Sequence, residues 1–110
     1  MRGIFRSKEF DEFYTSLPSN IQEKVKYALN IIAEIKVVNK KLVKKLTGTI
    51  FYELRISQGN EYRIILFAID NENFIEAKQI ILLNGFIKKS TKDYKQEINK
   101  AVQILNDLEK

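Results

Sequence analysis

The spacing of apolar residues changes once along this chain, and that change constrains the fold more than any other feature. Up to Ile35, apolar residues recur every three to four positions, as they do in amphipathic helices. From Gly48 they alternate with polar residues, as in half-buried strands, and the helical spacing returns after Lys89. The order predicts helices, then an antiparallel meander of strands, then a last helix. This arrangement is typical of an α+β domain.

Two helices are predicted before Gly48, with Pro18 between them. Ser7 can cap the first helix and Asn20 the second, because each side chain can accept a bond from a free backbone N–H. The short connection predicts a helical hairpin. The last helix can be capped by Ser90 or Thr91. The expected apolar stripes are Phe10, Phe13, Tyr14 and Leu17; then Ile21, Val25, Ala28, Leu29, Ile32 and Ile35; and finally Ile98, Ala101, Val102, Leu105 and Leu108.

The strands are predicted to form an antiparallel sheet of three to four members. The first long strand begins near Gly48, a turn falls at 58–60, and the second strand covers 62–69. The third lies between Phe74 and Leu83, and a weakly signalled strand at 3–5 would be the fourth. The helices are expected to cover one face and to leave part of the other open for a site. Residues 1–110 are expected to form one domain.

The missing residue types exclude several chemistries. The chain has no cysteine and no histidine, which removes thiolate nucleophiles, disulfides and the commonest general base. No grouping of carboxylates in the sequence suggests a metal site, so neither a metal nor a cofactor is expected. No apolar stretch approaches the roughly 20 residues that span a bilayer, and no signal peptide is apparent. We therefore expect a cytoplasmic protein without a membrane partner.

The positive charge is concentrated in two groups of lysines. The net charge of +5 favours a polyanionic partner, although charge alone does not define an activity. One group precedes the first long strand and the other follows the third strand, and solvated surface is the alternative interpretation of the first group. The two groups are Lys36, Lys40, Lys41, Lys44 and Lys45, and Lys88, Lys89, Lys92 and Lys95.

Two arginines, Arg55 and Arg63, stand inside apolar strands. A buried charge is costly unless an opposite charge pairs with it. Pairing across the turn at 58–60 would place the two arginines on neighbouring strands, where two guanidinium groups could clamp a phosphate. An ordinary cross-strand ion pair between Arg55 and Glu53 is the alternative.

An ordered set of short motifs resembles the phage-derived branch of the RelE/HigB-type toxins. The resemblance covers nearly the whole chain and implies a RelE-like fold. The motifs are Phe51–Ile56, Tyr62–Ile64 and Leu82–Lys89, with Phe13–Pro18 upstream and Glu97–Ala101 downstream. Three features depart from the family pattern. The segment from Phe74 to Gln79 is longer than usual, which leaves the start of the third strand open. Asp93-Tyr94 replaces a frequent Thr-Pro, and Asn84 stands where some relatives have histidine, so a histidine-dependent mechanism cannot be transferred.

The resemblance implies the toxin of a type II toxin–antitoxin system, a metal-independent endoribonuclease that cuts messenger RNA on the ribosome and inhibits translation. The implied partners are the ribosome with its messenger RNA and a cognate antitoxin. The antitoxin is expected to be a small helix-turn-helix protein encoded next to the toxin.

In the implied mechanism, the 2′-hydroxyl attacks the adjacent phosphate while Arg55 and Arg63 hold that phosphate. Lys88 and Lys89 are expected at the same site, where cations and partial burial would lower a lysine pKa from its usual ~10.4. Tyr94 is an alternative proton carrier if the positive surroundings lower its pKa; simple packing on the sheet is the other interpretation. The residues expected to contact RNA or the ribosome are Lys40, Lys41, Lys44, Lys45 and Lys92.

Two further functions remain open from the sequence. ParE-like toxins share the scaffold but inhibit gyrase, and a non-enzymatic nucleic-acid-binding regulatory domain would account for the charge alone.

Overall fold

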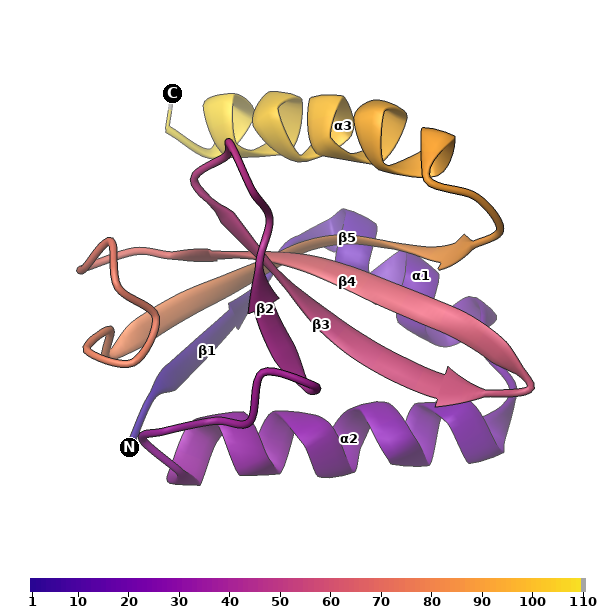
Figure 1. Cartoon of the computed structure of the whole chain (residues 1–110), viewed down its shortest axis with the longest axis horizontal. Helices are drawn as coiled ribbons and strands as arrows, with labels where there is room; N and C mark the ends of the chain where they lie inside the picture. Colours follow the sequence, from indigo (N-terminus) through magenta and orange to yellow (C-terminus); the bar gives the residue numbers. More distant parts are fainter. Residues whose placement is uncertain (110) are drawn as a thin grey trace.

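A five-stranded mixed sheet lies between two helical layers in the computed structural model, which describes residues 1–109 (Figure 1). The sheet order is β1-β5-β4-β3-β2, with β1 parallel to β5 and the other neighbours antiparallel. The strands are β1 (Gly3–Arg6), β2 (Val43–Lys45), β3 (Phe51–Gln58), β4 (Asn60–Ala68) and β5 (Gln79–Lys88). The helices are α1 (Lys8–Ser16), α2 (Ser19–Glu34) and α3 (Lys92–Leu108).

The α+β class is as predicted, but the predicted sheet is wrong in two respects. The weakly signalled first strand forms and pairs in parallel with β5, from Gly3 opposite Gln79 to Arg6 opposite Leu82. The unpredicted strand β2 adds to β3 at the other edge. With three residues in a lysine-rich segment, β2 is too short to show an alternating pattern. The third predicted strand begins within the predicted interval, at Gln79, but it extends beyond Leu83 to Lys88.

The predicted helical hairpin also needs correction. Ser7 caps α1 as expected, since its Oγ accepts a bond from the Phe10 N–H at 3.0 Å. The helix ends just before Pro18, but Pro18 itself is the N-cap of α2, and Asn20 lies inside that helix. The two helices share one core, yet α1 packs mainly on β5 rather than along α2. In Figure 1, α1 lies behind β5 while α2 runs beneath the sheet.

Helices pack against both faces of the sheet, so the expectation that they cover only one face is wrong. On one face, Leu54 and Ile64 pack in the same core as Val25 of α2. On the opposite face, Phe51 and Ile65 belong to a second core with residues of α3. The helix α3 crosses above this second face (Figure 1), so the open part of the face lies beside α3. Within residues 1–109, no helix has the length and apolarity needed to cross a membrane.

The side chain of Arg2 joins the end of α2 to the segment before β5. It is buried, and its guanidinium donates to five backbone carbonyls without a carboxylate partner. The guanidinium carbon also lies 4.4 Å from the centroid of the Phe74 ring. Because the last carbonyls of a helix lack partners within the helix, a cation here satisfies them and the helix dipole together. The five carbonyls belong to Ile32, Ile35, Lys36, Phe74 and Ile75.

We expect the Arg2→Ala substitution to lower the free energy of unfolding by about 3 kcal/mol, because charged hydrogen bonds are lost and buried carbonyls are left unpaired. Urea denaturation measures this. Arg6→Ala is the matched control: its ion pair with Asp11 is solvent-exposed, so the change should stay within about 0.5 kcal/mol. Equal effects of the two substitutions would contradict the assigned role of Arg2.

The contact between α1 and β5 depends on Gly85. A Cβ atom at this position would lie only 2.3 Å from a ring carbon of Phe13. We expect Gly85→Ala to destabilise the protein by about 1–3 kcal/mol, since the ring must move out of a packed position. Thermal unfolding measures the loss, and the same substitution in a Phe13→Leu background should cost less. An equal cost in both backgrounds would exclude the ring contact as the cause.

Candidate functional site

The β3–β4 hairpin places the two predicted arginines side by side. Gly59 makes the turn with a φ of 73°, a value that glycine adopts without steric cost. In the resulting register, Arg55 lies directly opposite Arg63. The prediction that these residues occupy neighbouring strands is confirmed. Alternation along each strand directs both side chains to the face that α3 crosses.

The carboxylate of Glu53 links these arginines to α3. Its Oε1 atom lies 3.3 Å from Nε of Arg55 and 3.5 Å from Nε of Arg63. The hydroxyl of Tyr94 donates to the same oxygen at 3.1 Å. Glu53 is only 3% exposed, so its charge depends on these partners for stabilisation.

Arg63 is buried, and each of its three guanidinium nitrogens donates to an acceptor within the protein. The residue is 1% exposed. Its Nε donates to the Tyr94 hydroxyl at 3.0 Å, and its Nη1 donates to the carbonyl of Tyr62 at 3.0 Å. Its Nη2 donates to Glu61 at 3.2 Å. The expectation that both guanidinium groups meet on an open surface is therefore wrong for Arg63, because internal acceptors take up its donors.

Arg55 instead borders an open hollow of about 310 Å³ on the α3 face. Its side chain is 33% exposed. Four cationic side chains and one carboxylate line the hollow, so an anion would be favoured there. The lining residues are Lys44, Lys45, Leu46, Thr47, Glu53, Arg55, Lys88, Tyr94 and Ile98.

The first turn of α3 holds Tyr94 at the wall of this hollow. The Asp93 carboxylate accepts bonds from the backbone N–H groups of Lys89 at 2.8 Å and Ser90 at 3.0 Å. These two bonds lower the pKa of Asp93. They tie the start of α3 to the end of β5. The predicted capping by the hydroxyl of Ser90 or Thr91 is wrong: Thr91 is the N-cap, but its side chain makes no capping bond.

Aromatic and cationic contacts then fix the Tyr94 ring. The ring packs edge-on against Phe86, with 5.5 Å between the ring centroids. The Lys88 ammonium lies 5.6 Å from the Tyr94 ring centroid, close enough for a cation–π attraction. Lys88 and Tyr94 therefore border the hollow together.

The pKa of Tyr94 is raised, contrary to the sequence-based expectation. Burial raises it first, and the neighbouring Glu53 carboxylate adds to the increase. The hydrogen bond from Arg63 acts in the opposite direction but does not reverse the result. The Arg63 guanidinium does lie against the hydroxyl, but burial and the Glu53 carboxylate together outweigh its effect on the pKa. The phenol is therefore held in its protonated form.

The other predicted lysines are spread over different surfaces. In β2, Lys44 pairs with Glu53 and Lys45 with Tyr52, so alternation directs these neighbours toward opposite faces of the sheet. The Lys45 ammonium lies 5.2 Å from the Tyr52 ring centroid. Four further lysines are exposed and are not among those that line the hollow beside Arg55. They are Lys40 and Lys41, before β2, Lys89, after β5, and Lys92, at the start of α3.

Glu53 is the site residue that sequence reasoning missed as a functional candidate. The strand pattern placed it on the same face as Arg55, but only as an ordinary ion-pair partner.

Asn84, where some relatives carry histidine, is buried beside α3, and its Nδ2 donates to the Glu97 side chain and carbonyl, both at 3.1 Å.

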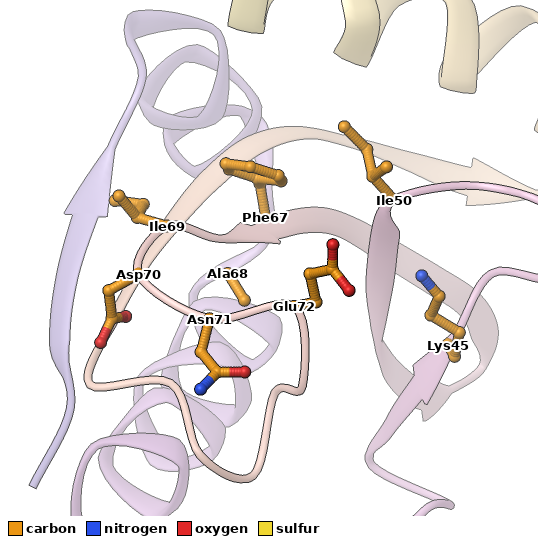
Figure 2. Close-up of a pocket in the computed structure, with 8 residues that line it drawn as sticks. All are labelled: Lys45, Ile50, Phe67, Ala68, Ile69, Asp70, Asn71 and Glu72. Carbon is orange, nitrogen blue, oxygen red and sulfur yellow. The ribbon is translucent and has the colours of Figure 1, made fainter.

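A larger hollow than the one beside Arg55 lies at the opposite end of β4. Figure 2 shows its lining side chains on β4 and the loop that follows, with Lys45 across from Glu72. Its volume is about 650 Å³. Because its acidic and cationic groups are mixed, we assign the candidate site to the smaller cationic hollow beside Arg55. Among residues 1–109, no group of three or more acidic side chains is arranged to hold a metal ion.

Solved structures that share this fold include three of E. coli RelE or its complex. The chain matches the crystal structure of the intact E. coli RelBE toxin–antitoxin complex with 16% identity and a TM-score of 0.62, covering 82% of this chain and 100% of the other. It matches a mutant of E. coli toxin RelE in the free state with 17% identity and a TM-score of 0.64, over 93% and 95% of the two chains. It matches the isolated E. coli RelE toxin with 16% identity and a TM-score of 0.63, over 91% and 98%.

The protein thus has a RelE-like α+β fold. The family model described as "Phage derived protein Gp49-like (DUF891)" matches residues 12–106. The chain therefore belongs to this phage-derived Gp49-like family, and the resemblance found in the sequence is confirmed. No protein of curated function matches the chain.

We expect Glu53→Gln to lower the pKa of Tyr94, because the Glu53 carboxylate helps to raise it. An NMR titration of the tyrosine ring carbons measures the change, with Tyr94→Phe to assign the signal. Glu23→Gln removes an exposed carboxylate on α2 and should leave this pKa unchanged. An unaltered titration of Tyr94 in Glu53→Gln would show that the two side chains are not coupled.

Proposed function

We propose that this protein is the toxin of a toxin–antitoxin pair and that it cuts messenger RNA on the ribosome without a metal ion. One observation carries the proposal: the hollow beside α3 combines the exposed guanidinium edge of Arg55 with Lys44 and Lys88. A forked guanidinium and nearby ammonium groups are suited to a phosphate in an RNA backbone. The RelE-like fold and the family membership support the same function.

The proposed reaction begins when the 2′-hydroxyl of the nucleotide before the cut loses its proton. The 2′-oxygen bonds to the adjacent phosphorus while the bond from phosphorus to the 5′-oxygen breaks. A second proton goes to the departing 5′-oxygen. The products are a 2′,3′-cyclic phosphate and a free 5′-hydroxyl, so the reaction needs RNA rather than DNA.

We assign the charge stabilisation to Arg55, whose free N–H groups can donate to the phosphate oxygens as negative charge develops. Arg63 acts through its partners, since it holds Glu53 and Tyr94 in place. Tyr94 retains its proton because its pKa is raised, so it is suited to protonate the 5′-oxygen. An ammonium group has no electron pair for a proton, so Lys88 can accept the 2′-proton only as the neutral amine; we assign it that role and assign Lys89 to a flanking phosphate.

The ribosome has a defined part in this proposal. A small open hollow cannot by itself fix a flexible RNA in the in-line geometry, whereas orientation can contribute about 7–11 kcal/mol to lowering a barrier. Lys44 and Lys92 extend the positive charge near the hollow and α3, and Lys40, Lys41 and Lys45 extend it around β2. We propose that these lysines contact ribosomal or messenger RNA, which would make association salt-sensitive.

A cognate antitoxin is part of the same proposal. One structure with this fold is that of a toxin–antitoxin complex, which supports such a partner. We propose a small helix-turn-helix protein encoded beside this one.

We expect the Arg55→Ala substitution to slow cleavage of ribosome-bound messenger RNA by about 100-fold, the usual effect of removing one preorganised donor. Primer extension on purified ribosomes measures the cut. A 2′-deoxy nucleotide before the cleavage position should abolish it. Lys24→Ala, an exposed lysine of α2 away from the hollow, is the control and should cleave normally.

Intact messenger RNA at every dose of the unaltered protein would reject the nuclease. Inhibition of gyrase in the same preparation would assign the protein to the alternative toxin class.

A further inference from the structure

Another hollow, which is mainly apolar, lies on the α2 side of the sheet. Its volume is about 580 Å³, and it opens between the segment after α2 and the segment before β5. Val37 on its wall is 68% exposed and Ile75 is 37% exposed. We call it the valine groove, and its lining residues are Val37, Val38, Asn39, Lys40, Val43, Lys44, Lys45, Thr47, Tyr52, Asn73, Phe74 and Ile75.

Two side chains hold the walls of the valine groove in place. The Tyr52 hydroxyl donates to the carbonyl of Glu72 at 3.0 Å and accepts from the Phe74 N–H at 3.1 Å. On the opposite side, Arg2 bonds to the carbonyls of Lys36 and Ile75 and so joins the two segments that form the walls. The groove is therefore preformed, and a ligand would not have to order it.

The charge at the rim of the valine groove has one sign. Three lysines, Lys40, Lys44 and Lys45, line it, and none of its lining residues is acidic. Lys36 nearby is already paired with Glu76 at 3.6 Å. An exposed apolar surface with a charged rim is typical of a site for another protein, and the rim determines the sign of the partner's charge.

We propose that the valine groove binds an acidic segment of a partner protein, with apolar side chains of that segment seated on Val37 and Ile75. Carboxylates of the segment then face the three lysines. An RNA backbone would match the charge of the lysines, but it has no aliphatic groups to pack against Val37 and Ile75. A second copy of this chain would bring the same lysines against each other, because a two-fold interface pairs identical surfaces. This inference does not depend on RNA cleavage.

The test uses fluorescence anisotropy of a labelled synthetic peptide with alternating glutamate and leucine. We expect saturable binding to the unaltered protein, and an affinity about tenfold weaker for the Val37→Ser/Ile75→Ser double variant. That loss corresponds to about 1.4 kcal/mol. Val102→Ser is the matched control, because Val102 is an exposed apolar residue of α3, 44% accessible, on the other side of the sheet. It should bind like the unaltered protein.

Two comparison probes separate the acidic segment from its rivals. A peptide in which glutamine replaces glutamate should bind weakly, and Lys40→Gln should weaken binding of the glutamate peptide only. Equal binding of both peptides, or no binding of either, would overturn the proposal. If poly(A) RNA binds the unaltered protein and binds the double variant more weakly, the groove is an RNA-binding surface. A dimer in sedimentation that the double variant abolishes would assign it to a second copy.

Discussion

The candidate site depends on one buried carboxylate, that of Glu53, shared among two guanidinium groups and a phenol. Taking these charges out of water costs several kcal/mol per ion, and only close oppositely charged partners offset that cost. Glu53 and Arg63 are both nearly inaccessible to solvent. The carboxylates of Glu53 and Glu61 supply the negative charge that offsets the cost of burying Arg63. The same Oε1 atom holds Arg55 at 3.3 Å, which fixes where the exposed guanidinium stands at the edge of the hollow.

The two arginines consequently have different tasks although the hairpin makes them direct neighbours. The inner one, Arg63, donates hydrogen bonds to Tyr94, Tyr62 and Glu61. The bond to Tyr94 fastens the start of α3 to β4. The outer one, Arg55, is 33% exposed and lines the open hollow. Within residues 1–109, no ion pair neutralises Lys44 or Lys88, so the hollow stays positive despite the acid beneath it. The buried pair of Arg63 and Glu53 supports the exposed cation of Arg55, and such support is what a preorganised anion site requires.

The sequence predicted those parts of the fold whose signals are local. Alternation located β3, the turn at Gly59 set the register, and together they placed Arg55 opposite Arg63. The parallel pairing of β1 could not be predicted, because its partner β5 lies more than seventy residues away and a four-residue strand has no period to detect. The burial of Arg63 was missed for a related reason. Only the packing of α3 over the sheet brings Tyr94 to its guanidinium, and no spacing in the chain encodes that contact.

The short strand β2 shows that two neighbouring lysines can border two different hollows. Lys44 and Lys45 are adjacent in sequence, but the pleat directs one toward Glu53 and the other toward Tyr52. Both lysines nevertheless lie at the edge of the sheet and line two hollows, a polar one beside Arg55 and an apolar one beside Val37. A phosphate suits the polar hollow because hydrogen-bond donors surround it. Aliphatic side chains suit the apolar hollow because their binding removes apolar surface from water. The residues that surround the shared lysines in each hollow, more than the net charge, therefore decide which ligand is favoured there.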